Sequence, residues 1–172
     1  MTKAGLAAGI GLTVSLVNLY FILSTFEPTH RPYIGVSEAW IEPQGQSQLG
    51  LVWVLRLKNV GNVPGRVTVK HFRAHCGNGP NQRTVFDESD VKNRYYILPQ
   101  ATVLLSSGLA ESPQDTTVHD IFEGRLPFKI ELELSYENPG FVFGSHHDYR
   151  AILEVSTGAR APSLSVVDAS GN

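Results

Sequence analysis

The hydrophobic and polar positions divide the chain into two parts. Residues 4–26 carry no charged side chain and are mostly apolar. At about 1.5 Å per residue, a helix of this length crosses a hydrocarbon core of about 30 Å. From residue 27 onward, charged and polar side chains recur throughout. The pattern predicts an N-terminal transmembrane anchor, residues 1–30, followed by one globular domain.

A cleaved signal peptide is the alternative interpretation of this segment. Lys3 supplies the positive start of such a peptide. The apolar run is longer than the usual range of about 7–15 residues, and it ends in aromatic side chains instead of an A-x-A cleavage site. We therefore expect an uncleaved single-pass anchor. The positive-inside rule, applied to Lys3 before the helix and Glu27, His30 and Arg31 after it, predicts a cytoplasmic N-terminus and a periplasmic or extracellular domain.

Small side chains recur at four-residue spacing within the predicted helix. Residues four apart lie on one helix face, and a face of small residues lets another helix approach closely. An amide in hydrocarbon also favours a neighbouring helix that satisfies it. The alternative is that glycine and alanine are simply common in membrane helices, so that the helix is only an anchor. The predicted packing face comprises Gly5, Gly9, Ala7, Gly11, Ser15 and Asn18.

After residue 31 the period of the pattern changes to two, which is typical of half-buried strands. The clearest case is residues 128–136, where apolar positions alternate with Lys129, Glu131, Glu133 and Ser135. Parity changes predict bulges near Ser37 and in residues 69–72. Strands are predicted at residues 33–42, 49–59, 66–75, 84–86, 95–98, 102–106, 128–136 and 149–155.

The spacing of strands and turns predicts a mainly β fold: an antiparallel β-sandwich of about seven strands that follows the transmembrane helix. The sandwich is expected over residues 31–156. Residues 157–172 are small and polar, and are expected to form an extended or disordered tail.

Residues 54–69 resemble the strand–turn–strand of immunoglobulin-like domains of the adhesion and CARDB type. The resemblance rests on an apolar strand, the N-x-G turn of Asn59 and Gly61, and Pro64 before a second alternating strand. It implies an immunoglobulin-like sandwich and no functional residue. The Cys…Trp…Cys spacing of true immunoglobulin domains is absent, since Cys76 is the single cysteine.

Length, net charge and cysteine count limit the classes of protein to which the chain can belong. Once the anchor is removed, 172 residues leave enough chain for one domain. The net charge of −2 gives no sign of the basic surface that nucleic-acid-binding proteins carry. One cysteine cannot form an internal disulfide framework.

The candidates for metal and acid–base chemistry are weak. His71 and His75 would lie about 13 Å apart on a strand, so a metal site with Cys76 would need His119, His146, His147 or Asp148 to converge from elsewhere. Glu131 and Glu133 would lie about 6.6 Å apart, which overlaps the separation of glycosidase carboxylates, but outward strand positions favour solvated charges. The chain has no G-x-S-x-G, H-E-x-x-H, phosphate-loop or C-x-x-C motif. We therefore expect no enzyme activity, no metal and no cofactor.

Aromatic side chains provide the remaining functional signal. Trp53 falls on an alternating apolar face and is expected in the core, whereas Phe141 and Phe143 lie in a connection and are candidate partner contacts. The predicted function is a non-catalytic accessory or structural subunit of a larger membrane complex, for example a respiratory or photosynthetic one. Its helix and sandwich would both contact other subunits, and its helix the lipid bilayer. The alternative is a surface-anchored ligand- or carbohydrate-binding module, which would need an exposed platform formed from residues such as Trp40, Trp53, Tyr95 and Tyr96.

Overall fold

The computed structural model describes Asn18 and residues 30–44, 50–89, 94–110, 116–139, 146–156 and 163–171. The mainly β prediction is confirmed, with nine strands in the described residues instead of about seven. The elements are β1 (Ile34–Pro43), β2 (Gly50–Asn59), β3 (Gly65–Cys76), a 3-10 turn (Gly79–Asn81), β4 (Arg83–Ser89), β5 (Arg94–Ile97), β6 (Thr102–Ala110), α2 (Thr117–Phe122), β7 (Phe128–Glu137), β8 (His146–Ser156) and β9 (Ser163–Gly171).

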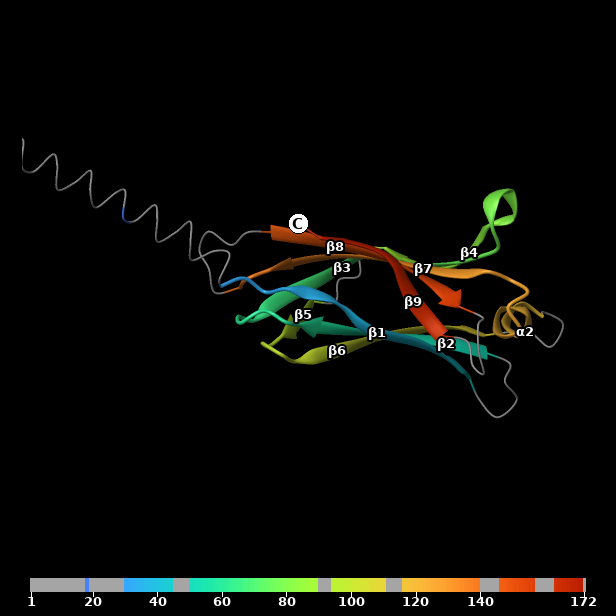
Figure 1. Cartoon of the computed structure of the whole chain (residues 1–172), viewed down its shortest axis with the longest axis horizontal. Helices are drawn as coiled ribbons and strands as arrows, with labels where there is room; N and C mark the ends of the chain where they lie inside the picture. The colour runs from blue at the N-terminus through green and yellow to red at the C-terminus, as the bar shows by residue number, and fades with distance from the viewer. Residues whose placement is uncertain are drawn as a thin grey trace, which may run out of the picture.

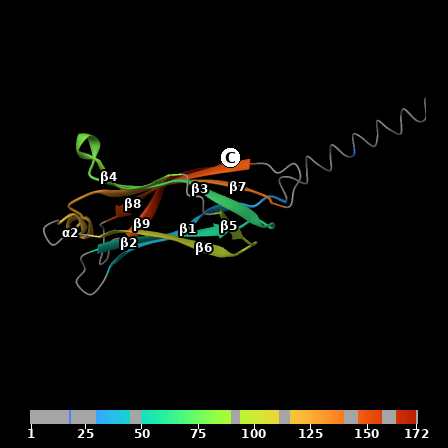
Figure 2. The same ribbon diagram turned by 180° about the vertical axis from the view of Figure 1, so that it is seen from behind.

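The strands form two antiparallel sheets that face each other (Figure 1, Figure 2). The smaller sheet has the order β1-β2-β6. The larger sheet has six strands in the order β4-β3-β7-β8-β9, with β5 also paired to β3. The chain therefore crosses from one sheet to the other between β2 and β3, through the turn at residues 60–64.

The core lies between the inner faces of β2 and β7. Leu51, Trp53, Leu55 and Leu57 of β2 are all fully buried, at 0% exposure. The Trp53 ring lies 5.4 Å from that of Phe128 at the start of β7. The alternating apolar side chains of β7 meet this face from the other sheet, so Trp53 is a core residue as predicted.

Both predicted bulges are present. The register of β1 against β2 shifts between Val36 and Glu38. The register of β3 against β7 shifts between Val69 and His71. A bulge inserts one residue and exchanges the faces of those that follow. In β3 this turns Phe72 toward the core and leaves the neighbouring polar side chains on the outer face.

Two elements differ from the expectation. The short helix α2 buries Val118 and Ile121 against one end of the core. Strand β9 lies in the range expected as a tail and pairs with β8 along its length. Most side chains of β9 are exposed, so its backbone pairing holds it in place. Such a strand has little hydrophobic pattern, which explains why the sequence did not predict it. The sandwich therefore extends beyond residue 156, where it was expected to end.

Within the described part of the chain, no helix is long and apolar enough to cross a membrane. The predicted anchor lies outside the described residues except for His30 at its end and Asn18, which is helical and exposed. The other members of the predicted packing face, Gly5, Gly9, Ala7, Gly11 and Ser15, also lie outside them. The anchor and its packing face stay predictions.

Candidate functional site

The histidines of β3 do not converge on its cysteine. His71 and His75 lie on the outer face of the larger sheet, where their rings meet the hydroxyls of Ser89 at 3.3 Å and Thr84 at 3.1 Å on β4. Cys76 points the other way and is buried in the core. No group of three His, Cys, Asp or Glu side chains in the described residues is placed to hold a metal ion.

The two glutamates of β7 stand in a ladder of charges across the outer face. Glu131 lies opposite Arg73 of β3, and Glu133 lies between His71 of β3 and Arg150 of β8. Cross-strand pairs of opposite charge contribute roughly 0.2–1 kcal/mol each. This placement supports a structural role for both carboxylates.

Ser135, His146 and Asp148 lie together on the same outer face. The Ser135 hydroxyl meets Nε2 of His146, and Asp148 Oδ1 lies 3.9 Å from that same nitrogen. In a nucleophilic triad the carboxylate instead orients the other ring nitrogen. Lys70 Nζ donates a hydrogen bond to Asp148 Oδ1 at 2.7 Å, and this bond is the main reason why the pKa of Asp148 lies below its usual value. The cluster is a polar network around the Lys70–Asp148 ion pair.

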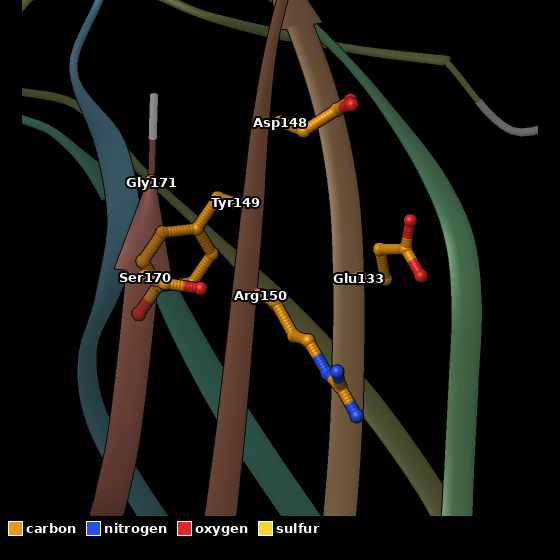
Figure 3. Close-up of a pocket in the computed structure, with 6 residues that line it drawn as sticks. All are labelled: Glu133, Asp148, Tyr149, Arg150, Ser170 and Gly171. Carbon is orange, nitrogen blue, oxygen red and sulfur yellow. The ribbon is translucent and has the colours of Figure 1, made fainter.

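A pocket of about 360 Å³ opens over β7, β8 and the end of β9. Figure 3 shows Arg150 extending across the neighbouring strand below Glu133, while the ring of Tyr149 lies on the side of the terminal residues of β9. Its described lining residues carry charges of both signs, with two carboxylates and one guanidinium. The lining residues are Glu133, Asp148, Tyr149, Arg150, Ser170 and Gly171.

A second pocket adjoins it at the end of the sandwich where the described domain begins. We call it the Arg31 pocket. It has a volume of about 340 Å³, and Arg31 is the one charged residue among the described residues that line it. Its walls come from both sheets and from the turn after β2. The lining residues are Arg31, Tyr33, Ile34, Gly35, Val60, Tyr136, Tyr149, Ala169, Ser170 and Gly171.

The side chain of Asn59 explains why these segments meet. Asn59 is fully buried. Its Oδ1 accepts hydrogen bonds from the backbone N–H groups of Gly61 at 2.9 Å and Tyr33 at 3.2 Å. Its Nδ2 donates to the carbonyl oxygens of Val63 at 2.8 Å and Ile97 at 3.0 Å. One amide thus ties the entry to β1, the turn after β2 and the end of β5 together.

Arg31 lies among aromatic rings in this pocket. Its guanidinium carbon is 4.3 Å from the centroid of the Tyr33 ring. Its Nε is buried and has no hydrogen-bond partner in the described part of the chain. Burial raises the pKa of Tyr136, and the nearby Arg31 charge acts in the opposite direction. The pocket therefore holds a cation whose hydrogen-bonding capacity is not fully used.

Large apolar side chains are exposed around the same end. Tyr33 is 38% exposed, Val60 60%, Tyr96 61% and Leu98 61%. The Val60 N–H donates to the Tyr33 carbonyl oxygen at 2.8 Å, which brings their backbones together. Arg66 at the start of β3 lies 5.4 Å from the Tyr96 ring centroid. Aromatic, aliphatic and basic groups thus gather where the chain enters the domain.

The other aromatic candidates lie apart. Trp40 is on the outer face of the smaller sheet, where its Nε1 donates to Glu42 at 2.6 Å and Arg56 lies 5.4 Å from its ring. Tyr95 packs against the core. Among the described residues, these rings do not form the common platform that a carbohydrate-binding module would need. Phe141 and Phe143, the candidate partner contacts, lie outside the described residues.

Sequence reasoning did not find the Arg31 pocket. Its residues are up to 140 positions apart between Arg31 and Gly171. One local signal was present: an arginine and a tyrosine directly after an apolar segment are typical of a membrane interface. Nothing in the local sequence around Tyr136 of β7 or Tyr149 of β8 indicated that they line a pocket.

No protein-family model and no curated protein matches the chain. It resembles a crystal structure described as ApaA from Bordetella pertussis, with 12% identity, a TM-score of 0.35, and coverage of 84% of this chain and 95% of that one. It also resembles a protein from Archaeoglobus fulgidus, with 12% identity, a TM-score of 0.32, and coverage of 80% of this chain and 96% of that one. At such low scores neither likeness supports an argument about function.

Proposed function

We propose that the protein is a non-catalytic, single-pass accessory subunit of a larger membrane complex, whose sandwich rests on the membrane surface with the end that begins at residue 30. The observation that carries this proposal is the gathering of Tyr33, Val60, Tyr96 and Leu98 at that end. The apolar run of residues 4–26 precedes it in the sequence.

The chemistry of this end suits the interface between lipid and water. Tyrosine rings lie at the level of lipid headgroups because one side is apolar and the other can be hydrated. Arginine next to such rings extends its charge toward the headgroups. Arg31 beside Tyr33 provides such a pair, and Arg66 lies beside Tyr96 while its charge is paired with Glu137. The charges that flank the anchor favour a cytoplasmic N-terminus and a periplasmic or extracellular domain.

The proposed contacts with other subunits use two regions. The predicted helix would pack through its small residues, and the sandwich would contact neighbours through its exposed faces. Charged residues on the outer face of the larger sheet are paired with one another, as in Arg66–Glu137, Lys70–Asp148 and Arg73–Asp87. This pairing supports a structural, non-catalytic role for these side chains. We also assign the sandwich to the immunoglobulin-like class from the pattern of residues 54–69.

Alkaline extraction of membranes from cells that make the full chain tests the anchor. We expect the protein to stay with the membrane pellet. Release into the soluble fraction with a new N-terminus near residue 26 would show a signal peptide instead. Mass spectrometry of proteins that co-purify in mild detergent then tests the complex, and stoichiometric membrane subunits are expected.

Spin labels test which end faces the bilayer. The full chain is reconstituted in vesicles with a label at Leu98→Cys or, as a control, at Asn78→Cys in the exposed turn after β3, near the opposite end. The buried Cys76 does not compete for the label. We expect lipid-soluble oxygen to relax the Leu98 label more strongly than the Asn78 label. Equal relaxation of both labels would contradict the proposed orientation.

A further inference from the structure

Among its described lining residues, the Arg31 pocket contains hydrogen-bond donors and no carboxylate. Arg31 is absent from the ion pairs formed within the described residues. Its buried Nε has no partner there either. A half-buried guanidinium of this kind is stabilised by an anion that reaches it.

Two further tyrosines, Tyr136 and Tyr149, line the same pocket. The Val36 N–H donates to the hydroxyl oxygen of Tyr149 at 3.3 Å. Burial raises the pKa of Tyr136, which keeps its hydroxyl protonated, while the backbone of Ile34 acts in the opposite direction. A hydroxyl that accepts a bond still has its own proton to donate. Tyr136 and Tyr149 therefore add two neutral donors to the charge of Arg31.

The walls fit an anion that is attached to an apolar body. Ile34, Val60 and Ala169 line the pocket beside the tyrosine rings. Tyr33 and Val60 are also exposed at the end that we propose to face the membrane. A free anion would gain little from these apolar groups, whereas the glycerol and acyl parts of a lipid would bury them.

We propose that the Arg31 pocket binds the phosphate group of an anionic phospholipid, with the guanidinium and the two tyrosine hydroxyls as its donors. The planar guanidinium matches phosphate oxygens in a bidentate manner. The inference rests on the proposed function, because that function places the pocket at the headgroup level. It adds a ligand class: a phosphate ester with an apolar tail.

Native mass spectrometry of the delipidated full chain in detergent tests this site. The probes are dioleoylphosphatidylglycerol, dioleoylglycerol, which lacks the phosphate, and inorganic phosphate. We expect the phospholipid to bind at least about tenfold more tightly than dioleoylglycerol, as charge-assisted hydrogen bonds predict. Inorganic phosphate should bind more weakly than the phospholipid. Equal binding of the two lipids, or inorganic phosphate binding as tightly as the phospholipid, would overturn the assignment.

Variants locate the site. Arg31→Gln should lower phospholipid affinity about tenfold or more, and Tyr149→Phe, which removes one hydroxyl, should lower it severalfold. Arg94→Gln is the matched control, since Arg94 is an exposed arginine of β5 outside the pocket. An unchanged affinity in both pocket variants, or an equal loss in Arg94→Gln, would contradict the proposal. If Arg31→Gln does not fold, Tyr149→Phe decides the question by itself.

The proposed function is tested separately. Resistance to alkaline extraction depends on the predicted anchor and not on Arg31. Loss of phospholipid selectivity in a chain that still resists extraction would overturn only the lipid site. Release by alkali would overturn the membrane function, whatever the pocket binds in detergent.

Discussion

The side-chain oxygen of Asn59 accepts the backbone N–H of Gly61 at 2.9 Å, and this turn packs against the chain that enters the domain. A Cβ atom on Gly61 would lie 2.5 Å from the carbonyl oxygen of Arg31. Real side chains do not approach a backbone atom so closely. The pair therefore explains why asparagine and glycine stand at these positions, and it sets the position of the Arg31 pocket.

Replacement of either residue should destabilise this end of the sandwich. We expect Gly61→Ala to lower the free energy of unfolding by about 1–3 kcal/mol, because the backbone at residue 31 must move. Asn59→Ala should cost about 2–4 kcal/mol, since it leaves several backbone groups without partners. Urea unfolding measures both changes. The control is Asn62→Ala, an exposed residue of the same turn. An effect of Asn62→Ala as large as that of Gly61→Ala would contradict this explanation.

Neighbouring residues of β7 should respond in opposite ways to substitution. Leu132 is fully buried, so Leu132→Asp places an unpaired charge in the core and should unfold the domain. Glu133 lies on the outer face, so Glu133→Ala should change the free energy of unfolding by about 1 kcal/mol or less. Thermal unfolding followed by circular dichroism compares the two variants. Equal melting temperatures would refute the assigned faces.

Gln100 adopts a conformation that favours glycine. It follows Pro99 in a turn where the Ala101 N–H donates to the Leu98 carbonyl oxygen at 3.0 Å, and its φ is 62°. We expect Gln100→Gly to raise the free energy of unfolding by about 0.5–1 kcal/mol, because glycine adopts this conformation without the steric cost. Gln82 is the matched control, since it is exposed and has a φ of −68°. Gln82→Gly should lower stability, and a gain in both variants would contradict the explanation.

The ion pair between Lys70 and Asp148 should make the free energy of unfolding fall at acidic pH. The hydrogen bond from Lys70 lowers the pKa of Asp148 from its ordinary value of 3.8. A carboxylate with a lowered folded pKa stabilises the fold above its unfolded pKa, and this contribution is lost as the pH falls through the folded pKa. Asp148→Asn should therefore lose less stability than the wild type between neutral pH and pH values below 3.8. Denaturant unfolding across this range measures it. Lys70→Met should flatten the same dependence, and an unchanged acid profile in both variants would refute the assignment.

The predicted helix provides a test that does not depend on the sandwich. Gly9→Leu and Gly11→Leu would place side chains where the backbone of a partner helix is expected. Both variants should still insert, because leucine favours the bilayer, but they should lose co-purification with their partners. Leu19→Ala, at a predicted lipid-facing position, should have a smaller effect. Retained co-purification in both leucine variants would show that the helix is only an anchor.

Alternation along a single strand was enough to predict much of the sandwich. The apolar parity of residues 128–136 identified the buried face of β7, and parity changes predicted the bulges found between Val36 and Glu38 and between Val69 and His71. These features are local, because side chains of a strand alternate between two faces whatever lies beyond them. The core position of Trp53 followed from the same rule.

Other features depended on residues far apart in the chain. Strand β9 has mostly exposed side chains, so its pairing with β8 left no hydrophobic pattern to recognise. The Arg31 pocket forms only because β1, β7, β8 and β9 bring Arg31, Tyr136, Tyr149 and Gly171 to one end. No local spacing encodes such a meeting, since it depends on which strands pair and in which register. Folding of the two sheets against each other brings these groups together and creates the pocket.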